Sequence, residues 1–137
     1  MVHRKGLHRH LCRVSVQRDG VSHRAGEAGH CQAVAEAVDG RIQVVASGHT
    51  ADSKADQYKQ IEDMMKIPRH RRYVLVSNRL DQKNEGEEVF MKNAQEIFEK
   101  FPEIDFGIYE CPMPWKRLVS LDFLRQVAPQ GRMVFLK

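Results

Sequence analysis

Residues 73–77 read YVLVS, and this short stretch decides the fold that the sequence predicts. Apolar side chains occupy four successive positions, so a strand built from them has apolar groups on both of its faces. Strands of this kind are typical of parallel sheets that are covered by helices. The stretch therefore predicts a central strand of a parallel α/β sheet.

Two segments with helical periodicity flank this strand. In residues 53–67 an apolar stripe recurs at helical spacing and ends before Pro68, which cannot continue a helix. In residues 87–101 a second apolar stripe runs along one side, and charged residues occupy the other side. We expect the second helix to bury the larger members of its stripe, which are Phe90, Ile97, Phe98 and Phe101.

The remaining segments continue this alternation. Further strands are predicted over residues 7–17, 41–47, 104–110 and 132–136, and shorter helices over residues 27–38 and 120–127. About five strands that alternate with helices favour a mainly parallel sheet. We expect a small three-layer α/β domain over residues 7–137, with helices on both faces of the sheet and a basic N-terminal arm at residues 1–6. Two alternatives stay open: Asp19-Gly20 can turn a hairpin, and the last strand can run antiparallel at an edge.

The composition is that of a single globular domain. The chain has 137 residues, of which 42% are hydrophobic, enough for a core without disulfides or a structural metal. It contains no apolar run of about 18 residues, the length that crosses a membrane, and no signal peptide is predicted. The three cysteines are widely spaced, which argues against a disulfide framework. We expect a cytoplasmic protein without a membrane partner.

The positive charge is concentrated near the N-terminus. Residues 1–30 contain six Lys or Arg and two Asp or Glu, and this excess equals the net charge of +4 for the whole chain. A basic segment favours an anionic partner, most often nucleic acid, although the alternative is a solvated terminus without one. The residues predicted to contact phosphates or bases are Arg4, Lys5, Arg9, Lys54, Arg71, Arg72, Trp115 and Lys116.

Residues 48–54, GHTADSK, lie between a predicted strand and a predicted helix. The stretch lacks the second glycine of a nucleotide phosphate loop, so that kind of site is excluded. Lys54 and the first N–H groups of the helix favour a simpler phosphate site. The alternative is structural: Ser53 and Asp56 have the spacing of a capping box.

Carboxylates follow several of the predicted strands. Asp52, Asp81 and Glu110, together with Asp19, converge on one sheet edge if the strands are parallel. Clustered carboxylates bind Mg²⁺ or Mn²⁺, and such an ion can drive phosphodiester hydrolysis. The predicted catalytic residues are His49, Asp52, Asp81 and Glu110, with Asp52, Asp81 and Glu110 as metal ligands and with Lys54 and Asn78 nearby. The alternative is that these residues cap helices and form turns.

Two functions remain open at the level of sequence. The first is a nucleic-acid-associated basic α/β domain that acts as a metal-dependent nuclease with Mg²⁺ or Mn²⁺. The second is a non-catalytic protein-interaction subunit of a larger complex, favoured by Trp115 in the proline-rich loop ECPMPWK at residues 110–116. No motif in the sequence decides whether the protein is an enzyme.

Overall fold

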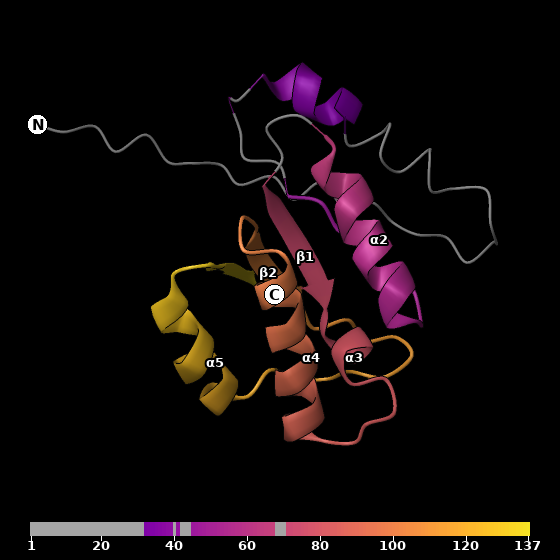
Figure 1. Ribbon diagram of the computed structural model, residues 1–137, viewed down its shortest axis with the longest axis vertical. Coiled ribbons are helices and arrows are strands. Elements are labelled where there is room, and N and C mark those ends of the chain that lie inside the picture. Colours follow the sequence, from indigo (N-terminus) through magenta and orange to yellow (C-terminus); the bar gives the residue numbers. More distant parts are fainter. Residues whose placement is uncertain (1–31, 40, 42–44, 68–70) are drawn as a thin grey trace, which may run out of the picture.

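The computed structural model describes residues 32–39, 41, 45–67 and 71–137 (Figure 1). The arm at residues 1–6 and the strand predicted over residues 7–17 lie outside the described residues, as does Asp19. In the part that is described, the protein is a mixed α/β structure in which a parallel sheet is combined with helices.

Three strands form the sheet: β1 (Arg72–Val76), β2 (Asp105–Tyr109) and β3 (Met133–Leu136). The helices are α2 (Lys54–Met65), α3 (Ser77–Leu80), α4 (Glu87–Lys100) and α5 (Leu121–Val127), and a 3-10 turn, η1 (Ala128–Gln130), leads from α5 toward β3. Residues 32–38 form a further helix.

All strand pairs are parallel, and their order in space follows their order in the sequence. β2 lies between β1 and β3. On the other edge of β1, Ala46 forms an isolated parallel bridge with Tyr73, and its carbonyl accepts the N–H of Val74 at 2.8 Å. Residues 73–76 of the YVLVS stretch thus lie in a strand of the parallel sheet, as their composition predicted, and Ser77 begins α3. The last strand is parallel rather than antiparallel.

The structure supports the parallel α/β sheet but not the finer details of the prediction. Among its described residues, the segment predicted as a strand over residues 41–47 contributes a bridge at Ala46 and no strand. The first predicted strand is not described. A sheet of about five strands in three layers is therefore not confirmed.

The helices α2, α4 and α5 pack on one face of the sheet. This face carries Tyr73, Leu75, Phe106 and Ile108, which alternate along β1 and β2 and are fully buried. They share one core with side chains from the three helices, among them Ile61, Phe90, Ile97, Phe98 and Phe123. Crossovers between parallel strands are right-handed, so helices that connect successive neighbours lie on the same face. This is why α2, α4 and α5 do not divide between the two faces as the sequence predicted.

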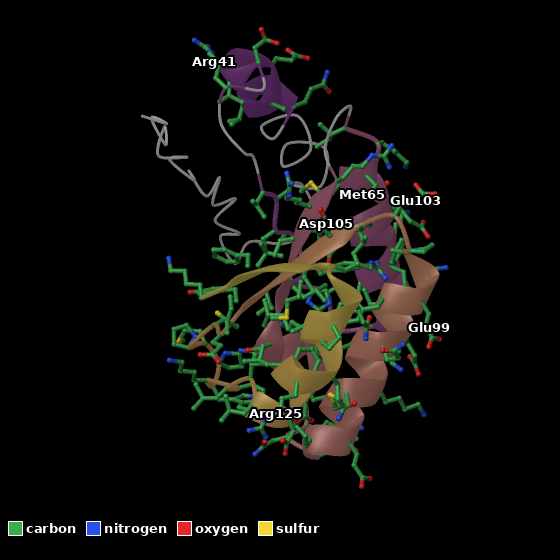
Figure 2. All side chains as sticks on the ribbon, turned by 90° about the vertical axis from the view of Figure 1, so that its left-hand side faces the viewer. Arg41, Met65, Glu99, Glu103, Asp105 and Arg125 are labelled. Carbon is green, nitrogen blue, oxygen red and sulfur yellow. The ribbon has the colours of Figure 1, made fainter. Side chains whose placement is uncertain are left out.

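Local signals set the helix boundaries that the sequence predicted. Ser53 caps α2, and its hydroxyl accepts the N–H of Asp56 at 3.1 Å. Ser120 caps α5 in the same way through the N–H of Phe123 at 3.0 Å. The predicted apolar stripe of α4 is buried along the helix, whereas Phe101 is half-buried at its end. Figure 2 shows Glu99 of α4 and Arg125 of α5 directed away from the core.

The edge strand β3 is held by two close contacts. A Cβ atom on Gly107 of β2 would lie 2.8 Å from the Cβ of Phe135, so glycine is needed where the two strands meet. Arg132, just before β3, donates to the carbonyls of Phe98, Phe101 and Ile104 at the end of α4. These contacts fasten the last strand to β2 and to α4.

Phe98→Ala should lower the free energy of unfolding by about 3–5 kcal/mol, because it leaves a cavity in a close-packed core. The Phe98 ring is buried and lies 5.0 Å from the ring of Phe106, centroid to centroid. Urea denaturation measures the change, with Glu99→Ala on the exposed side of α4 as the matched control. Equal stability of the two variants would contradict the packing described here.

Candidate functional site

The loops that follow Ala46, β1 and β2 meet at the carboxyl edge of the sheet. Parallel strands deliver the segments that follow them to the same edge, and this is where ligands of such sheets bind. Figure 1 shows α3 and the loop after β2 together beyond the arrowhead of β1. These segments contain the residues from which the sequence predicted a catalytic site.

His49 is fully buried and has both ring nitrogens engaged. Its Nδ1 accepts the N–H of Val76 at 3.0 Å, so Nε2 carries the proton and donates to Oε1 of Gln57 at 2.9 Å. Burial lowers the pKa of His49 to about 4, although the two hydrogen bonds act in the opposite direction. His49 is therefore neutral at pH 7 and links its loop to β1 and α2. Its predicted role as a base has no support in this geometry.

Asp52 and Lys54 lie at the start of α2, and each has a partner of opposite charge. Asp52 pairs with Arg79 of α3, and its backbone carbonyl accepts from Gln82 at 2.7 Å. Lys54 pairs with Glu96 of α4 at 2.6 Å. The loop from Gly48 to Lys54 thus turns the chain and starts the helix, as the structural alternative predicted.

Asp81 is fully buried beyond the end of α3. Its two oxygens accept the N–H groups of Glu85 at 2.7 Å and Gly86 at 3.2 Å. The Nε atom of Arg117 lies 3.3 Å from one of these oxygens. Asp81 therefore shapes the turn between α3 and α4 and neutralises a cation from the loop after β2.

Glu110 follows β2 and holds the same loop. One of its oxygens accepts the N–H of Val119 at 2.8 Å, and the other lies 3.9 Å from Nζ of Lys116. Asp52, Asp81 and Glu110 thus have three separate sets of partners. Among the residues described, no group of three or more His, Cys, Asp or Glu side chains is placed to hold a metal ion. The predicted Mg²⁺ or Mn²⁺ ligands do not fit such an ion here, because the loops already use these carboxylates.

The side chain of Asn78 anchors the loop between β2 and α5, which comprises residues 110–120. Its buried side-chain amide lies within donor distance of three backbone carbonyls of this loop, at 3.3 Å from Cys111, 2.7 Å from Met113 and 2.9 Å from Trp115. The Met113–Pro114 peptide bond is cis. The sequence placed Asn78 near a site but carried no signal for this anchoring role, which depends on the pairing of β1 with β2.

Arg117 anchors the same loop at a second point and was not singled out by sequence. Its guanidinium donates to Glu87 at the start of α4 at 2.8 Å and lies 4.9 Å from the centre of the Phe90 ring. Ser120 also donates to Glu87. An arginine that follows a lysine in a proline-rich loop gives no sequence signal that it will be buried against a carboxylate some thirty residues away.

Several apolar side chains of this loop and of the start of α5 are exposed. Met113, Leu118 and Leu121 expose 63%, 57% and 69% of their surface, and Trp115 is half-buried. The exposed large apolar side chains of the described chain are Met113, Leu118, Leu121 and Leu136, and Leu136 is 45% exposed. We call Met113, Trp115, Leu118 and Leu121 the apolar loop surface.

Among the residues that the structure describes, the basic predicted nucleic-acid contacts lie at two opposite edges of the sheet. Arg71 and Arg72 lie at the amino end of β1 beside Glu103 and Asp105, at 3.4 and 3.6 Å. Lys54 and Lys116 lie at the opposite, carboxyl edge, each beside a glutamate. The predicted contacts Arg4, Lys5 and Arg9 lie outside the described residues.

A small cavity of about 200 Å³ opens between α2, α3 and α4. Asp52, Lys54 and Arg79 are among its lining residues, whereas His49, Asp81 and Glu110 are not. The cavity therefore does not gather the predicted catalytic residues.

The chain matches no protein-family model, and no curated protein shows significant sequence similarity to it. None of the helices in the described part of the chain is long and apolar enough to cross a membrane.

The buried, neutral state of His49 predicts a loss of stability in acid. The unfolded chain binds a proton at His49 near pH 6.5, whereas the folded chain binds it near pH 4. The contribution of the neutral His49 to the free energy of unfolding is therefore complete above pH 6.5 and is lost as the pH falls toward 4. The loss between pH 7 and pH 4.5 is about 2 kcal/mol. Urea denaturation of the parent and of His49→Gln at both pH values measures it. The stability gap between the two proteins should narrow by that amount in acid, and a constant gap would refute the assignment.

Proposed function

We propose that this protein is a protein-interaction module that binds its partner through the apolar loop surface. The observation that carries the proposal is the opposite orientation of polar and apolar groups in the loop at residues 110–120 and at Leu121, the first residue of α5. Asn78 and Arg117 hold the loop from inside, while Met113, Leu118 and Leu121 face outward. Exposed apolar groups that gather on one segment are typical of protein interaction sites.

The anchoring supports this function in a second way. A loop that is already fixed loses less conformational entropy when a partner binds, so more of the contact energy appears as affinity. Asn78 of α3 and Arg117 of the loop itself fix the loop conformation through their side chains. The half-buried Trp115 adds an aromatic side chain of the kind that dominates interface energies.

The proposal is tested with the natural partner, isolated on the tagged full chain and then purified for calorimetric titration. The double variant Leu118→Ser/Leu121→Ser should weaken binding at least about tenfold, because central apolar contacts carry most interface energy. Lys92→Ser/Gln95→Ser, two exposed positions on α4, is the matched control and should leave affinity unchanged. Thermal unfolding of both variants should match the parent. Full affinity in the Leu118→Ser/Leu121→Ser variant would reject the loop as the binding surface.

We also propose a second function, association with nucleic acid through the N-terminal segment. It is supported by the position of the net charge, which lies entirely within residues 1–30. Lys54, Arg71 and Arg72 already face carboxylates, so the proposal depends on the arm. Nuclease activity is not part of it, because Asp52, Asp81 and Glu110 have other partners.

The arm makes a specific prediction about salt. Binding to a mixed-sequence oligonucleotide should weaken linearly on a logarithmic scale as salt rises, since each neutralised phosphate releases a counterion. Deletion of residues 1–6 removes Arg4 and Lys5 and should reduce the slope by about 2. Fluorescence anisotropy over a range of salt concentrations measures both slopes. Absence of binding at low salt would exclude this function and leave the interaction module.

A further inference from the structure

Residues 110–137, which include the apolar loop surface, and residues 31–109 carry opposite net charges in the sequence. Residues 110–137 contain five Lys or Arg and two Asp or Glu, an excess of three positive charges. Residues 31–109 contain 11 Lys or Arg and 14 Asp or Glu, an excess of three negative charges. The segment that carries the apolar loop surface therefore has the positive excess, although its Arg117 already pairs with Asp81 and Glu87.

Exposed cations stand beside the exposed apolar groups. Lys116 lies between Trp115 and Leu118, Arg125 follows Leu121 by one helical turn on α5, and Lys137 follows Leu136. Lys116 and Arg125 each expose more than half of their side chain.

Glu110 lies next to two of these cations, Lys116 and Lys137. Glu110 donates its N–H to the carbonyl of Lys137 at 2.8 Å, and its side chain contacts the backbone of Val119 and lies near Lys116. Glu110 offers little negative charge to a partner, since it is largely buried and one of its oxygens already accepts from Val119. Asp122 is the exposed carboxylate of this region, and it pairs with Arg125.

We propose that the apolar loop surface binds an acidic amphipathic segment of a partner protein, one that presents apolar side chains flanked by Asp or Glu. This inference rests on the proposed interaction function and specifies its partner. Apolar groups of the partner would cover Met113, Leu118 and Leu121, and its carboxylates would face Lys116, Arg125 and Lys137. Charge complementarity of this kind accelerates encounter and excludes partners of the wrong sign.

An anionic membrane would meet the same charges but fits this surface less well. The apolar groups come from a folded loop and from α5, which has seven residues, whereas helices that bind bilayer surfaces are usually longer. A peptide segment is therefore the occupant that the geometry favours.

The test uses the full chain and two synthetic peptides that contain no tryptophan. The peptides are amphipathic, share the same leucine positions and differ only in carrying Glu or Lys at every charged position. Trp115 is the single tryptophan of the chain and lies in the loop, so its fluorescence reports binding at the surface in question. We expect the acidic peptide to bind at least about tenfold more tightly than the basic one, with a preference that shrinks as salt rises.

Two charge variants locate the effect. Lys116→Glu should abolish the preference for the acidic peptide, whereas Lys59→Glu, an equal change at an exposed position of α2, should leave it intact. Equal effects of the two variants would overturn the inference, because net charge rather than the loop would then set the preference.

The remaining outcomes separate this inference from the proposed function. Binding of both peptides with equal affinity, lost in Leu118→Ser/Leu121→Ser, overturns the acidic partner but leaves an interaction surface. If neither peptide binds but the natural partner loses affinity for Leu118→Ser/Leu121→Ser, the acidic partner is likewise overturned and the interaction surface remains. Binding to phosphatidylserine vesicles but not to the acidic peptide replaces the protein partner by a membrane. Failure of the peptides together with full binding of the natural partner by the variant overturns both proposals.

Discussion

The parallel pairing of β1 with β2 is the constraint on which the rest of this structure depends. It places the end of β1 beside the end of β2, where Val76 lies opposite Tyr109. The segments that follow the two strands must then share one edge of the sheet. Because of this, the amide of Asn78 reaches the carbonyls of the loop after β2, and Arg117 of that loop reaches Asp81. The loop conformation is therefore a consequence of strand pairing.

Buried polar groups at this edge stabilise particular conformations and do not form a cluster. Asp81 accepts two N–H groups and forms an ion pair with Arg117, and His49 joins β1 to α2. Removing one partner of a buried ion pair leaves an uncompensated charge, which costs about 3–5 kcal/mol in comparable cases. Such groups hold the loops in one arrangement, and that arrangement exposes Leu118 and Leu121.

The two functions considered from the sequence use the same residues in different ways. A nuclease needs carboxylates that converge on an ion, whereas an interaction module needs loops of fixed shape with apolar groups outside. In this protein, Asp52 pairs with Arg79, and Glu110 accepts from the loop backbone. The carboxylates thus contribute to the fixed shape of the loops, on which the proposed interaction function rests. The positive charge of residues 1–30 does not depend on these contacts and supports the separate proposal of nucleic-acid binding.

The sequence by itself determined the features that depend on local periodicity and local chemistry. The apolar run at residues 73–77 predicted an interior parallel strand, the stripe of Phe90, Ile97 and Phe98 predicted the buried face of α4, and Ser53 and Ser120 predicted two helix starts. Each of these signals acts within a few residues, so it can be recognised without knowledge of the fold.

The tertiary structure decided the features that join distant parts of the chain. It placed α2, α4 and α5 on one face through strand order, neutralised His49 by burial, and directed Asn78 and Arg117 toward partners about thirty residues away. A carboxylate after a strand has the same local sequence whether it binds a metal ion, a guanidinium or a backbone N–H. Its partner is set by which loops the sheet brings together, and that is a property of strand order and crossover handedness rather than of neighbouring residues.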